Sequence, residues 1–147
     1  MNDVGIPESP AWPHAPGGPK APLAIESAFC LEHGFELIEY GDGCAKISCE
    51  VLSRHLNRHG NAHGGLIAAL LDTSMGLATR TSGNIENVGT ASLNVNYLRP
   101  AHGRVVARAR MRRFGRTLAF CDAEAIDARD QIVATATGVF AIVHLTR

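Results

Sequence analysis

The sequence predicts an α+β domain in which one long helix is wrapped by an antiparallel sheet of five or six strands. An apolar run with helical spacing covers residues 63–81, and alternation with a period of two follows over residues 90–98, 104–114, 117–128 and 131–144. A helix that is apolar on nearly every side must be buried. Short connections between successive strands favour an antiparallel meander. A meander that curves around a central helix satisfies both observations.

The elements before the long helix are shorter. Residues 23–32 carry the apolar spacing of a short amphipathic helix. Two strands are predicted over residues 35–40 and 44–52, and the glycine-rich turn 41–43 suits a hairpin between them. A loop over residues 53–62 then leads to the head of the long helix.

The N-terminal segment has a different composition from the rest of the chain. Residues 1–23 hold six of the seven prolines, at positions 7, 10, 13, 16, 19 and 22. This spacing matches the three-residue turn of polyproline II, so we expect an extended or disordered arm. The arm could also be a ligand for a partner domain. Residues 24–147 form the predicted domain, and we expect function to survive removal of the arm.

Composition limits the function classes. The chain has 147 residues, of which 46% are hydrophobic and 19% charged, as expected for one globular domain. No apolar run approaches the ~20 residues of a membrane span, and the N-terminus does not resemble a signal peptide, which favours a cytoplasmic location and no membrane partner. The four cysteines lack metal-site spacing, so we expect reduced, partly buried thiols at Cys30, Cys44, Cys49 and Cys121.

The net charge is zero, but the positive charges are unevenly distributed. Half of the 14 Lys and Arg residues lie between positions 99 and 116, with no acid among them: Arg99, Arg104, Arg108, Arg110, Arg112, Arg113 and Arg116. On a strand, the even-numbered members would share one face. This pattern indicates a solvated strand face or a site for the phosphates of a nucleotide-bearing substrate. Nucleic-acid binding is less favoured, because few aromatic residues interleave with these arginines.

The predicted long helix carries a backbone-amide anchor and a single carboxylate. His63-Gly64-Gly65 stands at its head, and Asp72 follows an apolar run. A helix N-terminus exposes N–H groups and the positive end of the helix dipole, and two glycines allow a polarised carbonyl oxygen to approach. We expect Asp72 to be desolvated among Leu, Ile and Ala, which makes a carboxylate a stronger base or nucleophile. Together these features indicate acyl-group chemistry.

The spacing of these two features predicts a dimer. Eight residues of helix rise about 12 Å, whereas a group acting on a bound carbonyl must lie about 3 Å from it. Gly64 and Asp72 of one chain therefore cannot serve the same carbonyl. Two copies of the helix packed antiparallel could bring them together, so we expect an obligate two-fold dimer with shared sites.

Several motif residues carry a family likeness: His55-Leu56-Asn57, Gly60, His63-Gly64-Gly65, Asp72, Asn94, Tyr97, Pro100 and Gly115-Arg116. Over about residues 30–144 the chain resembles the hotdog-fold acyl-CoA thioesterases, in particular the PaaI-like branch of phenylacetate degradation. The resemblance implies a homodimer, often paired into a homotetramer. It also implies hydrolysis of acyl-CoA thioesters to free acid and coenzyme A without a metal or redox cofactor.

The resemblance also implies roles for the helix residues. Gly64 matches the residue whose backbone N–H polarises the thioester carbonyl, with Gly65 beside it. Asp72, from the partner chain, matches the catalytic carboxylate. As alternatives, the glycines could serve close helix packing, and Asp72 could be satisfied by polar neighbours.

Three further residues are implied as members of the catalytic group. Asn57 matches an amide that places the attacking water or the carboxylate, His63 lines the carbonyl site, and Thr90 matches a hydroxyl that holds the water. Asn57 could instead form a turn, and His63 could simply cap the helix. His55 fits a structural role better. Arg112, Arg113 and Arg116 would, on this view, meet the phosphates of coenzyme A.

Other functions are compatible with parts of this pattern. His55, His59 and His63 recur every four residues, as zinc ligands on a helix would. Gly60 argues for a loop there, so we expect no metal site. A hotdog-fold hydratase or dehydratase is an alternative, although the histidine and acid pair of those enzymes is not found. A non-catalytic acyl-CoA-binding module is another alternative.

Overall fold

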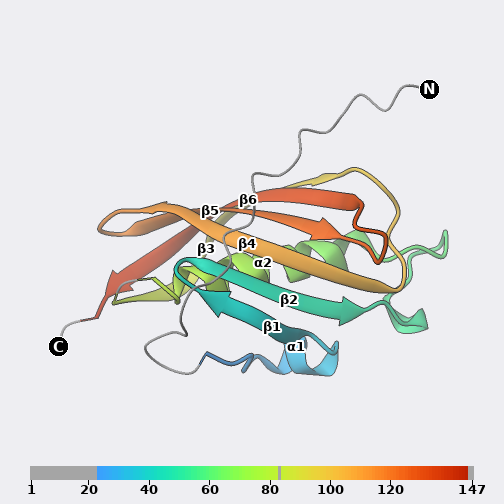
Figure 1. Cartoon of the computed structure of the whole chain (residues 1–147), viewed down its shortest axis with the longest axis horizontal. Coiled ribbons are helices and arrows are strands. Elements are labelled where there is room, and N and C mark those ends of the chain that lie inside the picture. The colour runs from blue at the N-terminus through green and yellow to red at the C-terminus, as the bar shows by residue number, and fades with distance from the viewer. Residues whose placement is uncertain (1–22, 83, 146–147) are drawn as a thin grey trace.

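The computed structural model describes residues 23–82 and 84–145, and it shows one long helix wrapped by a six-stranded antiparallel sheet (Figure 1). The predicted α+β class is confirmed. In chain order the elements are α1 (Ala28–Glu32), β1 (Glu36–Gly41), β2 (Cys44–Glu50), the 3₁₀ turn Ser53–His55, α2 (Gly64–Thr79), β3 (Ile85–Tyr97), β4 (Arg104–Phe114), β5 (Leu118–Ile126) and β6 (Ile132–His144).

Two predicted boundaries are wrong. The helix predicted over residues 23–32 begins only at Ala28, because Ser27 has an extended backbone and its side chain accepts a hydrogen bond from the Cys30 N–H as an N-cap. Strand β3 begins five residues earlier than residue 90, because Ile85 and its neighbours pair with the end of β6.

The predicted proline-rich arm lies, apart from Leu23, outside the described residues. Leu23 itself contacts the domain, since its N–H donates to the Tyr40 hydroxyl at 3.3 Å.

The strand order is β1-β2-β4-β5-β6-β3, so the predicted simple meander is only partly right. Strands β4, β5 and β6 form a meander, but β3 pairs with β6 at the sheet edge rather than with β4. The link 98–103 has room for this crossover: its six residues span up to ~20 Å, whereas three strand spacings amount to about 14 Å. The length of this link therefore could not show whether β3 pairs with β4 or crosses the sheet to pair with β6.

Helix α2 packs into the concave face of the sheet. Leu70, Leu71 and Met75 are fully buried. Strand β4 faces the helix with small buried side chains such as Ala107 and Ala109, which allow close approach, while its arginines point away. The predicted alternation of this strand is confirmed.

One stripe of α2 remains partly accessible in the described chain. It runs along neighbouring turns and comprises Gly65, Ala68, Ala69, Asp72 and Thr73. The predicted burial of the helix therefore holds for every face but this one. Beside it, β3 pairs only with β6, and its other edge has no strand partner among the described residues.

The four cysteines are free and buried. Burial raises the pKa of the Cys49 thiol to about 11 and that of Cys121 to about 12, so both thiols stay protonated at neutral pH. These values fit structural cysteines. Within the described ranges, no helix has the length and hydropathy needed to cross a membrane.

Candidate active site

The head of α2 presents one backbone amide to the surroundings. His63 is the N-cap, and its Nδ1 accepts the Gly65 N–H at 2.8 Å. The Leu66 and Ile67 N–H groups both donate to the His63 carbonyl, at 3.0 and 3.3 Å. Within the described chain only the Gly64 N–H of this first turn is left without an acceptor. A substrate oxygen at the helix head would therefore meet Gly64, whereas Gly65 donates to His63.

The free Gly64 N–H is a strong donor for two reasons. It belongs to the same peptide group as the His63 carbonyl, which accepts two hydrogen bonds from the helix. Such bonds polarise the peptide and strengthen its N–H as a donor. The N–H also lies at the positive end of the α2 dipole, where negative charge is stabilised.

Tyr97, at the end of β3, fixes the same turn of the helix. Its hydroxyl donates to the Gly64 carbonyl at 2.6 Å. A Cβ at Gly64 would lie 3.3 Å from the tyrosine ring, which explains the glycine as a residue of close approach. Partial desolvation raises the pKa of the Tyr97 phenol, so the hydroxyl remains a donor at neutral pH. The motif alone indicates no role for Tyr97, although the alternation of β3 turns Val95 and Tyr97 towards the helix.

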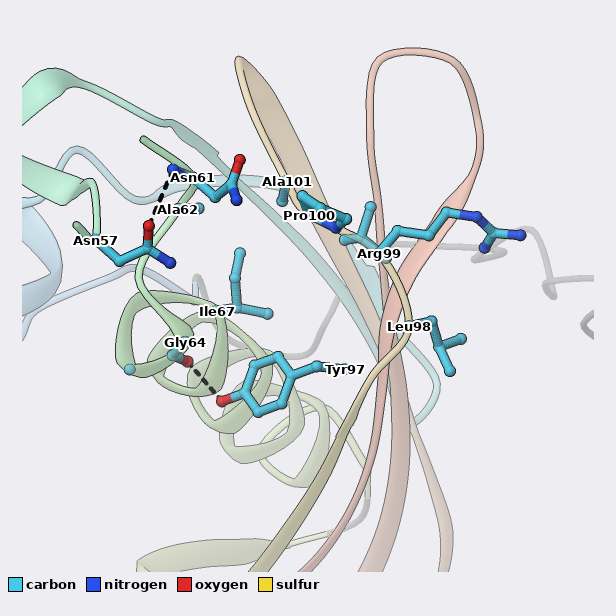
Figure 2. A pocket seen from close by; sticks show the side chains of 12 residues that line it. Asn57, Asn61, Ala62, Gly64, Ile67, Tyr97, Leu98, Arg99, Pro100 and Ala101 are labelled. Atoms are coloured by element: carbon cyan, nitrogen blue, oxygen red, sulfur yellow. Dashed lines mark hydrogen bonds between the residues drawn. The ribbon is translucent and has the colours of Figure 1, made fainter. Parts of the chain in front are cut away.

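Asn57 forms the turn considered for it, and its amide also faces the helix head. Its Oδ1 accepts the backbone N–H groups of His59 at 2.9 Å and Asn61 at 3.1 Å, which closes the loop before the helix. This leaves the side-chain NH₂ of Asn57 on the opposite side, facing the helix head in Figure 2. The turn therefore orients the amide as a donor towards the site.

These groups border a pocket of about 490 Å³ at the helix head, which we call the helix-head pocket (Figure 2). Its walls come from the loop before α2, the first turn of α2 and the β3–β4 link. The lining residues are Asn57, Asn61, Ala62, Gly64, Gly65, Ile67, Tyr97, Leu98, Arg99, Pro100, Ala101 and Val133.

The candidate carboxylate lies in a second pocket of about 440 Å³, the acid pocket. Asp72 Oδ1 accepts a hydrogen bond from the Thr90 hydroxyl at 2.7 Å, so the structure brings these two predicted residues together. Asp72 is half-buried on the accessible stripe of α2, so the expected desolvation is only partial in the single chain. Apolar walls come from Ile25, Phe29, Ala69, Leu77 and Phe140.

Sequence reasoning missed the other polar residues of the acid pocket. Arg80 and Glu86 form an ion pair at 3.1 Å, and the Asn87 amide lies against Gly76 of the helix. Glu86 and Asn87 precede residue 90, where the sequence predicted the strand to begin. The predicted strand therefore did not place their side chains near the helix.

No residue lines both pockets. Gly64, Gly65 and Asn57 border the helix-head pocket, whereas Asp72 and Thr90 border the acid pocket. The separation that helix geometry requires is therefore present in the folded chain, with the two groups on different turns of α2 and in different depressions.

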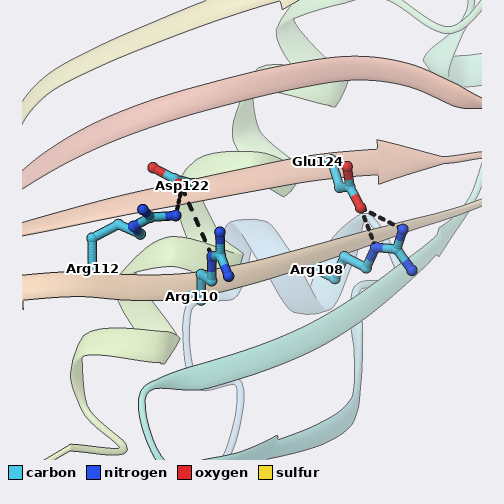
Figure 3. A network of polar contacts seen from close by, with 5 residues as sticks. All are labelled: Arg108, Arg110, Arg112, Asp122 and Glu124. Carbon is cyan, nitrogen blue, oxygen red and sulfur yellow. Dashed lines mark hydrogen bonds and ion pairs between the residues drawn. The ribbon is translucent and has the colours of Figure 1, made fainter. Parts of the chain in front are cut away.

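The arginine cluster is partly neutralised by the neighbouring strand (Figure 3). Asp122 of β5 pairs with Arg112 at 3.0 Å and with Arg110 at 3.9 Å, and Glu124 pairs with Arg108. These acids are distant from the arginines in the sequence. They belong to the next strand, and strand pairing brings them alongside. Within residues 23–82 and 84–145, Arg113 and Arg116 have no ion-pair partner.

The histidines at positions 55, 59 and 63 are not aligned as helical metal ligands. The segment is a 3₁₀ turn followed by a loop, as Gly60 suggested. His63 caps α2, while the buried His55 hydrogen-bonds His33 on another element. The structural role expected of His55 is thereby confirmed.

Three comparisons relate the chain to known proteins. The family model for the thioesterase superfamily matches residues 59–134. A protein of Thermoplasma acidophilum that is provisionally named an esterase is 33% identical over 109 residues, which cover 74% of this chain and 83% of that protein.

Two solved structures share the fold. The phenylacetic acid degradation protein PaaI of Thermus thermophilus is 32% identical, and the match covers 78% of this chain and 98% of that one with a TM-score of 0.71. A protein of Streptococcus mutans solved with bound acetyl CoA is 28% identical, with coverage of 78% and 92% and a TM-score of 0.71.

Proposed function

The chain belongs to the thioesterase superfamily and has the hotdog fold, and from this premise we propose that it hydrolyses acyl-CoA thioesters to the free acid and coenzyme A. The observation that carries the proposal is the Gly64 N–H at the polarised head of α2, which has no acceptor among the described residues. The PaaI relative and the relative with bound acetyl CoA support an acyl-CoA substrate.

In this proposal the thioester carbonyl oxygen accepts the Gly64 N–H. Negative charge grows on that oxygen as a nucleophile adds to the carbonyl carbon, so a fixed donor stabilises the transition state more than the substrate. Removing one such donor typically costs about 10²–10³ in turnover. The Asn57 amide faces the same pocket and orients the attacking water or the carboxylate.

Asp72 of the partner chain drives the addition by one of two routes. As a nucleophile, its oxygen adds to the carbonyl carbon, the C–S bond breaks, and the thiolate leaves; water then cleaves the mixed anhydride and regenerates the carboxylate. As a general base, it takes a proton from water while the water oxygen attacks; the C–S bond of the tetrahedral intermediate then breaks, and the proton passes to the leaving thiolate. Thr90 holds the carboxylate oxygen that does not react.

The accessible stripe of α2 supports the proposed dimer. A two-fold axis beside residue 68 of antiparallel helices places Gly64 of one chain level with Asp72 of the other, because 68 is midway between 64 and 72. Ala68 and Ala69 lie at that midpoint, and their small side chains permit close approach. The free edge of β3, with Val88 60% exposed, runs beside the stripe and offers a second contact between the copies.

The arginines at the end of β4 are the proposed contacts for coenzyme A phosphates. Arg113 and Arg116 have no ion-pair partner in the described ranges, whereas Arg112 shares its guanidinium with Asp122. An arginine that already has a carboxylate partner must exchange it to bind phosphate, so Arg113 and Arg116 are the stronger candidates.

The test is thiol release from a panel of acyl-CoA thioesters with phenylacetyl, benzoyl, hydroxylated aromatic and medium-chain acyl groups. We expect turnover of at least one member, and we expect Asp72→Asn to lower kcat by about 10²–10⁴ with KM nearly unchanged, since the carboxylate acts in the chemical step. Asp130→Asn is the matched control, because Asp130 is exposed and has a positive φ of 60° that asparagine tolerates.

Near-wild-type turnover by Asp72→Asn would remove the carboxylate from its role. An enoyl-CoA thioester is included in the panel, because hydration of its double bond without thiol release would indicate a hydratase. Tight binding of the whole panel without turnover would indicate an acyl-CoA-binding module.

A further inference from the structure

Two histidines from separate elements meet at the start of the loop that precedes α2. The Nδ1 of His33, which caps the end of α1, lies 3.0 Å from the Nε2 of His55. His55 is 4% exposed, and its Nδ1 accepts the Leu52 N–H at 3.0 Å. His33 in turn packs on the Phe29 ring, with the ring centroids 4.5 Å apart.

These contacts define where the protons are. Because the Nδ1 of His55 is an acceptor, the proton of its neutral ring is on Nε2, which donates to the Nδ1 of His33. A further proton on His55 would occupy Nδ1 and displace the Leu52 N–H. A proton on the Nδ1 of His33 would face the Nε2–H of His55. Both hydrogen bonds therefore exist together only when both rings are neutral.

The same histidine is joined to the candidate active site through the backbone. The His55 carbonyl accepts the His63 N–H at 2.8 Å, and Leu56 and Ala62 form a β-bridge just inside it. Asn57 follows His55 by two residues, and Gly64 follows His63 directly. The His55–His63 hydrogen bond therefore closes the base of the loop that holds Asn57 and leads directly into Gly64.

We propose that His33 and His55 form a positioning pair that holds Asn57 and Gly64 in their active arrangement while both rings are neutral, and releases them when the pair takes up a proton. The consequence for turnover rests on the proposed thioesterase function. The expected effect on the loop does not depend on that function.

The surroundings of the pair disfavour a positive charge. Burial, the nearby Arg54 guanidinium and His33 all lower the pKa of His55, in that order, and only a backbone contact with Glu50 opposes them. From β2, the Cys49 thiol donates to the His33 carbonyl and stays protonated. From α1, the group that meets Arg54 is the Glu32 backbone carbonyl, which carries no charge.

The sign of the pH dependence follows. With a folded pKa below the ordinary histidine value of 6.5, neutral His55 contributes stability that is complete above 6.5 and is lost as the pH falls through the folded pKa. The loop is therefore expected to loosen on the acid side.

The first test follows the full-length, isotope-labelled protein by NMR between pH 8 and pH 5. We expect the backbone amide of Gly64 and the side-chain amide of Asn57 to shift with the same midpoint as the His55 ring, below 6.5. This measurement needs no substrate, so it holds even if no thioester is cleaved. If the amide signals of Asn57 and Gly64 do not change as His55 titrates, the proposal is overturned.

The second test separates positioning from folding with two substitutions of His33. His33→Phe keeps a ring against Phe29 but removes the acceptor, whereas His33→Asn offers an amide oxygen near the former Nδ1. At pH 8, with the panel thioester that the wild type cleaves fastest, we expect His33→Phe to lose about tenfold in kcat with KM within about twofold, and His33→Asn to stay within about twofold in kcat.

The pH profile of turnover completes the test. The acid limb is expected to move together with the His55 midpoint in His33→Asn, whereas His102→Asn, at an exposed histidine of the β3–β4 link, keeps the wild-type limb. Wild-type kcat in His33→Phe, or an acid limb that stays in place while His55 moves, would contradict the positioning role.

Discussion

At the head of α2, one histidine decides which of two glycine amides can reach a substrate. His63 binds the Gly65 N–H with its own Nδ1, and the Gly64 N–H is left facing the pocket. In the proposed mechanism, the cap that His63 forms therefore also prepares the site. Capping one amide and polarising the peptide of the other prepares a single, strong hydrogen-bond donor.

The carboxylate has an equally simple partner. Thr90 lies on β3, the strand that follows the helix, and its hydroxyl donates a hydrogen bond to the Asp72 carboxylate at 2.7 Å. A hydrogen bond to one oxygen fixes the orientation of the other, and it lowers the side-chain entropy that must be lost in the transition state.

Replacing this threonine tests the orientation effect. Thr90→Val keeps the shape but removes the hydroxyl, so we expect kcat to fall about tenfold to a hundredfold with little change in KM, corresponding to the loss of one hydrogen bond to a charged group. Steady-state thiol release measures both constants. Thr137→Val is the matched control on the exposed face of β6. Equal kcat in the two variants would contradict the role given to Thr90.

The motif predicted the helix head because its residues act through local spacing. A His-Gly-Gly run before an apolar helix specifies a helix head whatever the rest of the fold does. Tyr97 was missed because its contact with Gly64 joins residues 33 positions apart. The partners of Arg108 and Arg112 were missed for the same reason, since strand register alone places Glu124 and Asp122 beside them.

At the scale of elements, α2 is both the core and the platform of the site. Leu70, Leu71 and Met75 bury one side against the sheet, while Ala68, Ala69 and Asp72 remain accessible on the other. The helix head and the carboxylate are held by a rigid element on which their separation cannot vary. This rigidity is why the spacing of two residues carries information about assembly.

Truncating a buried residue of α2 tests its role as the core. Leu70 is fully buried, so Leu70→Ala is expected to lower the free energy of unfolding by about 2–5 kcal/mol through lost burial and a residual cavity. Urea denaturation at fixed protein concentration measures this, because assembly would also affect stability. Leu31→Ala, at a helical leucine that is 58% exposed, should change the free energy of unfolding by less than about 1 kcal/mol. Similar losses in both variants would contradict the assignment of the core.

Periodicity predicted the elements but not their order in the sheet. Alternation identified the last three strands with ends within two residues of the observed ones, since their inward side chains are small and apolar. The placement of β3 beside β6 depends on pairing between distant segments. Two arrangements with the same links satisfied the pattern equally, and only the folded sheet distinguishes them.

At the scale of the molecule, we propose that one chain carries two half-sites. The helix-head pocket has the donor and the acid pocket has the carboxylate, with no residue in common. An antiparallel pair of α2 helices would bring the helix-head pocket of each chain to the acid pocket of the other. Two copies would then hold two complete sites, each dependent on both chains.

The most direct measurement of this claim is complementation between two inactive variants. Asp72→Asn removes the carboxylate. Gly64→Pro removes the N–H at a first helical position that accepts proline after the extended His63, and its ring displaces the exposed Tyr97 side chain. We expect each homodimer to lose at least about 10² in kcat, and the purified heterodimer to regain about half of the wild-type kcat, because one of its two sites is intact. A heterodimer as inactive as its parents would contradict a site shared between chains.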